Sequence, residues 1–299
     1  MQHVQKRHGL SQRRACTILG QHRSTQRYLP TRPEQDAALV AELRRLSRRH
    51  KAWGYKMAYK HLRRKGWKIN RKRVERVWRE AGLTARHVKR RSGKKASGSA
   101  DNAIWNLPAE RPNHVWACDF KTERLANGRP YRILNVIDEY TRRSLGRVVA
   151  HSIGARRVQQ ELTRLFRAHG RPELFRTDNG REFIAESLVQ WLSDRGVTAI
   201  PVEKASPQQN GLVESFHRTM GRQLLDWERF ETLLEAKAVI DDWATNYNSG
   251  HYHQALGDLT PNEFHQACLT ALREGHPLPL PQTRTRTPKP KTARMDVHK

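Results

Sequence analysis

Apolar residues in the first 82 positions recur at the spacing of amphipathic helices. Residues 11–29 fit two short helices on either side of Gly20, with Ser11 as an N-cap, which is typical of a small helix-turn-helix unit. Three longer segments follow, and each gathers leucines, valines or aromatic residues on one face: 34–50, 55–66 and 70–82. The pattern predicts an all-helical N-terminal region, although residues 11–29 would also suit a helical hairpin that does not touch DNA.

From residue 114 onward, short apolar runs that suit β-strands replace the purely helical pattern. Runs separated by turn residues predict a meander of three strands at 114–123, 130–141 and 143–151. Helices and strands are then predicted in alternation, followed by one more helix, at 154–170, 172–180, 182–196, 197–203, 211–226 and 231–247. This succession predicts an α/β fold in which helices flank a mixed sheet.

The chain carries a large excess of positive charge. Its 299 residues include 57 lysines and arginines against 29 aspartates and glutamates, which gives a formal charge of +28. Such an excess suits a polyanionic partner, and nucleic acid is the usual one. An anionic membrane is the alternative, but no stretch approaches the ~20 apolar residues of a bilayer span, and the first residues lack the apolar segment of a signal peptide.

The spacing of the cysteines indicates the redox environment of the protein. Cys16, Cys118 and Cys268 are far apart in the sequence and form no CxxC pair. They indicate neither a disulfide framework nor a structural zinc site, and they suit a reducing interior.

Positive charge is concentrated in the helical region, where residues 42–95 hold 22 lysines and arginines but only 3 acidic residues. The helix predicted at 70–82 carries five of these on its outer faces: Arg71, Lys72, Arg73, Arg76 and Arg79. A face of one sign repels itself unless something anionic lies opposite, so we predict contacts with DNA phosphates there. An ordinary solvated face is the alternative.

Composition divides the chain into four parts. Residues 1–88 form the basic, helix-turn-helix-like region, and residues 89–108 form a basic stretch rich in Gly and Ser that suits a flexible linker. Residues 109–270 hold the longer apolar runs and form the core-rich domain. Residues 271–299 are rich in Pro, Thr and basic residues, and we predict that they are disordered.

Three acidic residues stand out in the core-rich domain. Asp119 lies inside a strand, Asp178 ends a short strand beside Asn179 and Gly180, and Glu214 lies in the first turns of a helix. A carboxylate at the edge of a buried sheet is costly unless it is paired or bound to metal. Taken singly, Asp178 would suit a turn, Asp119 would suit an arginine pair, and Glu214 would suit a helix dipole. Together, on a chain suited to a polyanion, they predict one site.

The segments that contain these acids, "WACDF", "RTDNGREF" and "SPQQNGLVESFHRTM", resemble the catalytic segments of DDE transposases and retroviral integrases. Thirty-five residues separate Asp178 from Glu214, which is the typical spacing of the second and third acids in that superfamily. Residues 246–264 resemble the Tyr-Asn…His…Leu-Gly…Thr-Pro stretch that closes the core in transposases of bacterial insertion sequences. The similarity is greatest to the second-frame product of two-frame insertion sequences, and it covers residues 8–265.

The chain departs from the pattern of that family at three points. Residues 250–253, Gly-His-Tyr-His, stand where Arg-Pro-His is usual, which affects a local contact and not the chemistry. Arg181 stands where proline is frequent. The zinc-binding His/His/Cys/Cys module of retroviral integrases is missing from the sequence.

The resemblance implies an RNase H-like integrase catalytic core, preceded by a basic all-helical DNA-binding region. It implies a DDE-type transposase, a polynucleotidyl transferase that cleaves DNA strands and transfers them during transposition. Asp119, Asp178 and Glu214 would be its catalytic and metal-binding residues, with two Mg²⁺ or Mn²⁺ ions and Asp119 shared between them. Arg218 and Arg222 follow Glu214 at helical spacing, and we predict that they bind phosphates near the scissile bond.

The resemblance also implies partners. These are double-stranded DNA at the element ends and the target, other copies of the chain on that DNA, and an upstream-frame DNA-binding protein that is fused to the chain or acts with it. The implied location is the bacterial cytoplasm, at the nucleoid. Two alternatives stay open, a nuclease of the same fold that cuts without joining and a catalytically inactive DNA-binding regulator. The sequence does not decide whether three further residues assist catalysis: Glu182, His217 and His253.

Overall fold

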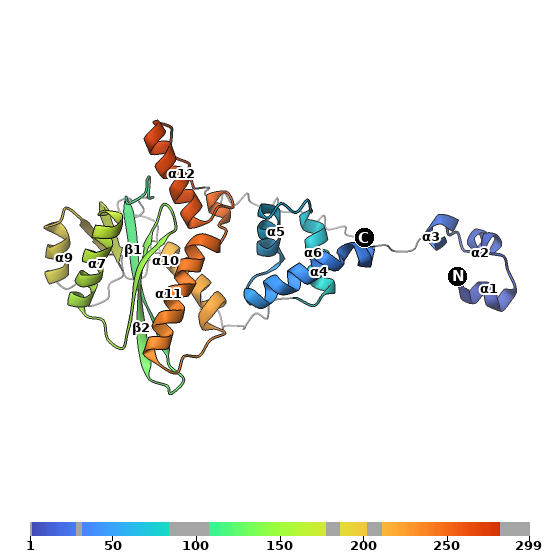
Figure 1. Ribbon diagram of the computed structural model, residues 1–299, viewed down its shortest axis with the longest axis horizontal. Helices are drawn as coiled ribbons and strands as arrows, with labels where there is room; N and C mark the ends of the chain where they lie inside the picture. The colour runs from blue at the N-terminus through green and yellow to red at the C-terminus, as the bar shows by residue number, and fades with distance from the viewer. Residues whose placement is uncertain (1, 28–31, 84–107, 178–185, 202–210, 282–299) are drawn as a thin grey trace, which may run out of the picture. The chain divides into compact units, whose positions relative to one another are not determined.

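The computed structural model describes residues 2–27, 32–83, 108–177, 186–201 and 211–281. The chain divides into two compact units, residues 1–85 and 86–299 (Figure 1). The described part of the first unit is helical, as the periodicity predicts, with these elements: α1 (Gln2–His8), α2 (Gln12–Ile18), α3 (Arg23–Arg27), α4 (Arg32–Arg49), α5 (Tyr55–Arg64) and α6 (Arg71–Glu80).

Local sequence explains where two of these helices begin. At the start of α2, the Ser11 hydroxyl accepts a hydrogen bond from the Arg14 N–H at 3.4 Å. At the start of α6, the Asn70 side chain accepts one from the Arg73 N–H at 2.7 Å. Helices α4 and α5 both contact α6 through apolar faces, and their buried residues include Leu39, Leu43, Leu46, Leu62, Val74, Val77 and Trp78.

The second unit is built on a five-stranded mixed sheet. Its strands are β1 (Val115–Arg124), β2 (Pro130–Asp138), β3 (Ser144–Ala150), β4 (Leu174–Thr177) and β5 (Thr198–Pro201). They lie in the order β3-β2-β1-β4-β5 across the sheet. The first three form the predicted antiparallel meander, whereas β4 runs parallel to β1 and β5 runs parallel to β4.

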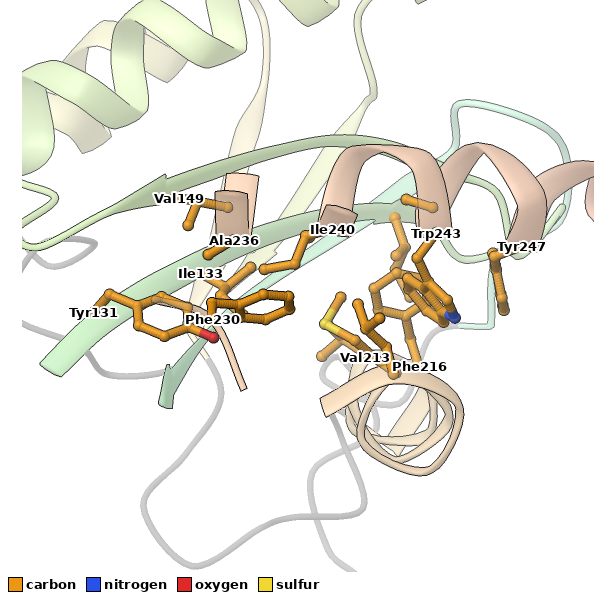
Figure 2. Packing of buried hydrophobic residues seen from close by; sticks show 14 of the residues in the cluster. Tyr131, Ile133, Val149, Val213, Phe216, Phe230, Ala236, Ile240, Trp243 and Tyr247 are labelled. Carbon is orange, nitrogen blue, oxygen red and sulfur yellow. The ribbon is translucent and has the colours of Figure 1, made fainter. Parts of the chain in front are cut away.

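Helices cover both faces of this sheet (Figure 1). On one face, α7 (Ala155–His169) and α9 (Glu186–Ser193) share a core with Trp116 and Cys118 of β1. On the other, α10 (Gly211–Met220) and α11 (Leu233–Gly250) share a core with Ala117. Figure 2 shows side chains of this second core, where aromatic and aliphatic residues of α10 and α11 meet the strands. Because side chains alternate along a strand, residue 119 belongs to the α10 face.

Two segments differ from the prediction. The helix expected at 211–226 is α-helical only to Met220, and Gly221–Leu225 form a π-helix. After a short 3-10 helix (Gln254–Leu256), a further helix, α12 (Pro261–Glu274), begins at a capping box and packs Phe264 against Tyr140. Helix α12 therefore continues past residue 271, where the sequence analysis begins the tail. Residues 89–107 of the predicted linker and 282–299 of the predicted tail lie outside the described residues.

Candidate catalytic site

Asp119 lies in the middle of β1, on the sheet face that α10 covers. Its side chain is 19% exposed. The Oδ1 atom accepts a hydrogen bond from the N–H of the next residue, Phe120, at 2.7 Å. The other carboxylate oxygen, Oδ2, lies 3.3 Å from Nδ1 of His217 on α10. The Asp119 carboxylate is therefore hydrogen-bonded at one oxygen, contacts His217 at the other, and still reaches solvent.

Asn135 of β2 lies beside Asp119 in the sheet. The two residues are directly opposite each other in the antiparallel β1–β2 pair. The Asn135 side chain is completely buried, and its Nδ2 atom lies 2.9 Å from Nε2 of His217. Asn135 is not one of the predicted site residues. The available signal was a polar residue inside the apolar run of residues 133–137.

Glu214 is carried by α10, and apolar contacts hold this helix against the sheet. Val213, Phe216 and Met220 are buried in the core that α10 shares with α11 (Figure 2). Glu214 is partly exposed on the helix that also carries His217. It precedes His217 by three residues, which is about 4.5 Å along a helix axis, and residues at this spacing lie on neighbouring faces. The contact of His217 with Asp119 therefore brings this end of α10 close to β1.

The remaining predicted acid, Asp178, lies outside the described residues, as does Glu182. The last described residue before Asp178 is Thr177 of β4, which is in register with Cys118 of β1. Within the ranges that the structure describes, no three His, Cys, Asp or Glu side chains come together as a metal-binding group. Asp119 and Glu214 are the members of the predicted set that these ranges contain.

A buried ion pair joins β4 to the residue that follows β2. Arg176 of β4 donates through Nη1 to both carboxylate oxygens of Glu139, at 2.9 and 3.1 Å, and both side chains are buried. Burial raises the pKa of Glu139 to about 7, against the opposing effect of Arg176. The neighbouring Asp138 accepts hydrogen bonds from the Asn113 N–H and from the N–H and hydroxyl of Thr141. Both acids are therefore engaged by groups of this chain, Glu139 by Arg176 and Asp138 by Asn113 and Thr141.

The two arginines predicted to bind phosphates beyond Glu214 are exposed. Arg218 lies on the last turn of α10, and Arg222 lies on the π-helix. The wider π turn changes the regular helical spacing between Arg218 and Arg222. Gly221, which lies between them in the sequence, is buried. The carbonyl of Arg222 accepts a hydrogen bond from Nε1 of Trp227 at 2.7 Å, which fixes the backbone there.

In the helical unit, the five basic residues predicted on the outer faces of α6 separate into two groups. Arg73 and Arg76 both bind the buried carboxylate of Asp36, at 2.7 and 2.6 Å, and hydrogen bonds from the two guanidinium groups oppose the effect of burial and leave the pKa of Asp36 lowered. Arg79 pairs with Glu75 one turn earlier. The other two are exposed on the first turn: Arg71 and Lys72. The anionic group that faces Arg73 and Arg76 thus comes from this chain.

Comparison with known families agrees with this geometry. Two family profiles, both described as an integrase core domain, match residues 109–207 and 195–261, and a profile described as an HTH-like domain matches residues 34–91. An uncharacterized 31.7 kDa protein of insertion element IS407 from Burkholderia multivorans is 35% identical over 88% of this chain and 94% of its own length. The transposase of insertion sequence IS904 from Lactococcus lactis is 28% identical over 79% of this chain and 96% of its own length. The chain belongs to the insertion-sequence transposases.

Membership of this family confirms several predictions. The transposase has the predicted mixed sheet of an integrase core behind a helical, helix-turn-helix-like region, and it is an enzyme of the DDE type. Its family and its HTH-like domain imply that it binds DNA. The comparisons give no support to the alternatives of a non-joining nuclease or an inactive regulator. A solved catalytic core domain of HTLV-2 integrase is similar over 52% of this transposase and 97% of that chain, with 16% identity and a TM-score of 0.42.

The structure also bears on the membrane alternative. None of the helices in the described ranges is both long enough and apolar enough to cross a bilayer.

Proposed function

We propose that Asp119, Asp178 and Glu214 are the catalytic acids of this transposase and that together they hold divalent metal ions, Mg²⁺ or Mn²⁺, two in number. The observation that carries this proposal is the contact between Asp119 and His217. It supports the proposal because α10, the helix that carries Glu214, packs against β1. The end of β4, next to Asp178, is adjacent to the same part of β1.

The donor chemistry of the described residues fits such ions. Carboxylate oxygens are hard ligands of the kind that Mg²⁺ and Mn²⁺ prefer. Asp119 and Glu214 are both partly exposed, so water and a phosphate can reach them. When bound, the ions would activate the attacking oxygen and stabilise the leaving oxygen during cleavage and strand transfer. The excess of positive charge on the chain favours the approach of DNA.

The remaining parts of the chain receive roles within the same proposal. Residues 1–88 would bind the DNA ends, with Arg71, Lys72 and Arg79 as exposed phosphate contacts on α6. Residues 89–108 would link this region to the catalytic core at 109–270, and residues 271–299 would form the tail. Arg218 and Arg222 would bind phosphates near the scissile bond. The transposase would act as an oligomer on DNA at the nucleoid of a bacterium, alone or with an upstream-frame protein.

An assay on DNA that carries the inverted repeats flanking the element tests the catalytic assignment. Asp119→Asn, Asp178→Asn and Glu214→Gln remove one charge each and nearly preserve the shape of the side chain. Each variant should lose both strand cleavage and the joining of pre-cleaved ends, while DNA binding in a gel-shift measurement survives. A variant that cleaves at a near-normal rate removes that residue from the catalytic set. Cleavage without joining by the wild-type chain would favour the nuclease alternative.

A further inference from the structure

We infer that His217, held by Asn135, is a positioning residue for Asp119. This inference rests on the proposed function, in which Asp119 binds metal. The three side chains form a continuous row in which Asn135 Nδ2 lies 2.9 Å from His217 Nε2, and His217 Nδ1 lies 3.3 Å from Asp119 Oδ2. The row connects β2, α10 and β1.

The orientation of the Asn135 amide indicates which nitrogen of His217 carries the proton. In this orientation the Asn135 amide donates, so Nε2 of His217 must accept and has no hydrogen of its own. The proton of a neutral imidazole is then on Nδ1, which is the nitrogen that faces Asp119. This nitrogen lies 3.3 Å from Oδ2 of Asp119, a close contact that is not a formed hydrogen bond in the structure. Hydrogen bonds at catalytic sites commonly tighten when the site is loaded.

Asn135 is a rigid anchor for this row. It lies on a central strand, it is fully buried, and it is the direct cross-strand neighbour of Asp119. A buried amide is unfavourable unless it forms hydrogen bonds, and strand positions around Asn135 are otherwise occupied by Ile133, Leu134 and Val136. An apolar residue would suit this position better if packing alone mattered. The contact with His217 gives the amide a role that packing does not.

The row restricts the carboxylate of Asp119 at both ends. Oδ1 accepts a hydrogen bond from the N–H of Phe120, and Oδ2 lies 3.3 Å from Nδ1 of His217. A carboxylate oxygen has two lone pairs, so each oxygen keeps one for a metal ion. Side chains that orient a metal ligand in this way commonly change metal affinity or activity by about 10- to 100-fold when they are removed. We therefore expect His217 to control the metal requirement of the transposase and to leave its affinity for DNA unchanged.

A purely structural role for His217 predicts something different. His217 also lies next to Phe216, whose ring packs against Trp243 and Tyr247 in the core (Figure 2). If His217 only fills space, then His217→Phe should preserve function because it keeps the size of the ring. If its N–H group orients Asp119, His217→Phe should weaken metal binding. His217→Asn, which retains an N–H donor, should recover part of that binding.

The test measures metal binding directly and separately from catalysis. Mn²⁺ binding to the full-length chain is followed by electron paramagnetic resonance for the wild type, His217→Phe, His217→Asn and Asp119→Asn. The Mg²⁺ concentration for half-maximal cleavage is measured at saturating DNA. His217→Phe should weaken Mn²⁺ binding and raise the Mg²⁺ requirement, both by about 10- to 100-fold, with partial recovery in His217→Asn. Ser215→Ala, at an exposed position of the same helix, serves as the matched control and should change neither quantity.

The outcomes separate this inference from the proposed function. If Asp119→Asn weakens Mn²⁺ binding but His217→Phe does not, Asp119 binds metal and the role given to His217 is wrong. If Asp119→Asn leaves Mn²⁺ binding intact, the proposed function itself fails at that residue. Thermal unfolding of each variant checks that it is folded. Should His217→Phe not fold, His217→Leu and Asn135→Leu, which also remove the side-chain donor, provide the same comparison, and unchanged Mn²⁺ binding in both would overturn the inference.

Discussion

Thr177, the last described residue of β4, lies opposite Cys118, the residue that precedes Asp119 on β1. The two strands are parallel, and neighbouring strands are about 4.8 Å apart. The described end of β4 therefore lies next to the part of β1 that carries Asp119. Helix α10 reaches the same part of β1 from above the sheet through the contact of His217 with Asp119. Two parts of the fold that are far apart in the sequence thus adjoin the segment of β1 that carries Asp119.

The salt dependence of DNA binding tests the arginines that follow Glu214. Arg218→Ala and Arg222→Ala should each weaken binding, because each removes a positive charge from an exposed position near the site. If each arginine neutralises one phosphate, the slope of log K against log salt should fall by about 0.9 per substitution. Arg273→Ala, at an exposed position near the end of α12, is the matched control. An unchanged slope in either of the first two variants would remove that arginine from the DNA contact.

The packing of α7 against β3 should not tolerate a larger side chain at Gly146. A Cβ atom on Gly146 would lie 2.6 Å from Oε1 of Glu161 and 2.6 Å from Cδ2 of Leu165. Overpacking of this kind commonly costs about 1–3 kcal/mol, so Gly146→Ala should lower the free energy of unfolding by that amount. Gly250→Ala is the control, because a Cβ there meets nothing within 4 Å. Urea unfolding of both variants provides the comparison, and equal stability would mean that α7 packs farther from β3.

Acid should destabilise the helical unit through His50. The ring of His50 stacks on Trp53 at 3.8 Å, and burial, with smaller effects of Arg49, His61 and Arg45, lowers the pKa of His50 from 6.5 to about 4. Between these values the unfolded chain binds more protons than the folded one. The unit is therefore most stable above pH 6.5 and loses this contribution as the pH falls toward 4.

Substitution of His50 should remove part of this pH dependence. Thermal unfolding is compared at about pH 7 and pH 5, between which the ionisation of His50 favours the unfolded chain. The difference in Tm should be smaller in His50→Gln than in the wild type. His22→Gln, at an exposed position, should behave like the wild type. If His50→Gln retains the full difference, His50 ionises in the folded unit as freely as in the unfolded chain.

Local sequence patterns predict the helices and strands of this fold better than the contacts between them. The spacing of Leu39, Leu43 and Leu46 is visible in the sequence, and all three are buried in the structure. The mixed sheet follows in the same way from the succession of apolar runs. By contrast, Asn135 and His217 are 82 positions apart and meet only when α10 docks on the sheet. No periodicity within either segment contains that information.

Two helical segments were not predicted from the sequence, and the reasons differ. The start of α12 carries a readable signal, since Thr260 and Glu263 form a capping box with Pro261 at the first helical position. That helix could have been predicted from local sequence. The π-helix at Gly221–Leu225 could not, because a 3.6-residue period was assumed through the whole segment and the extra residue per turn depends on packing around α10.

Replacing Asp119 or Asp178 by cysteine tests the central claim most directly. A thiolate is a soft ligand that Mg²⁺ binds poorly, whereas Mn²⁺ lies further toward the ions that thiolates accept. The measurement is the rate of strand cleavage by each variant on end-bearing DNA, with Mg²⁺ and with Mn²⁺. If these residues bind the metal, both Asp119→Cys and Asp178→Cys should be inactive with Mg²⁺ and should recover part of the activity with Mn²⁺. Cleavage at the wild-type rate with Mg²⁺ in either variant would contradict the assignment of that residue as a metal ligand.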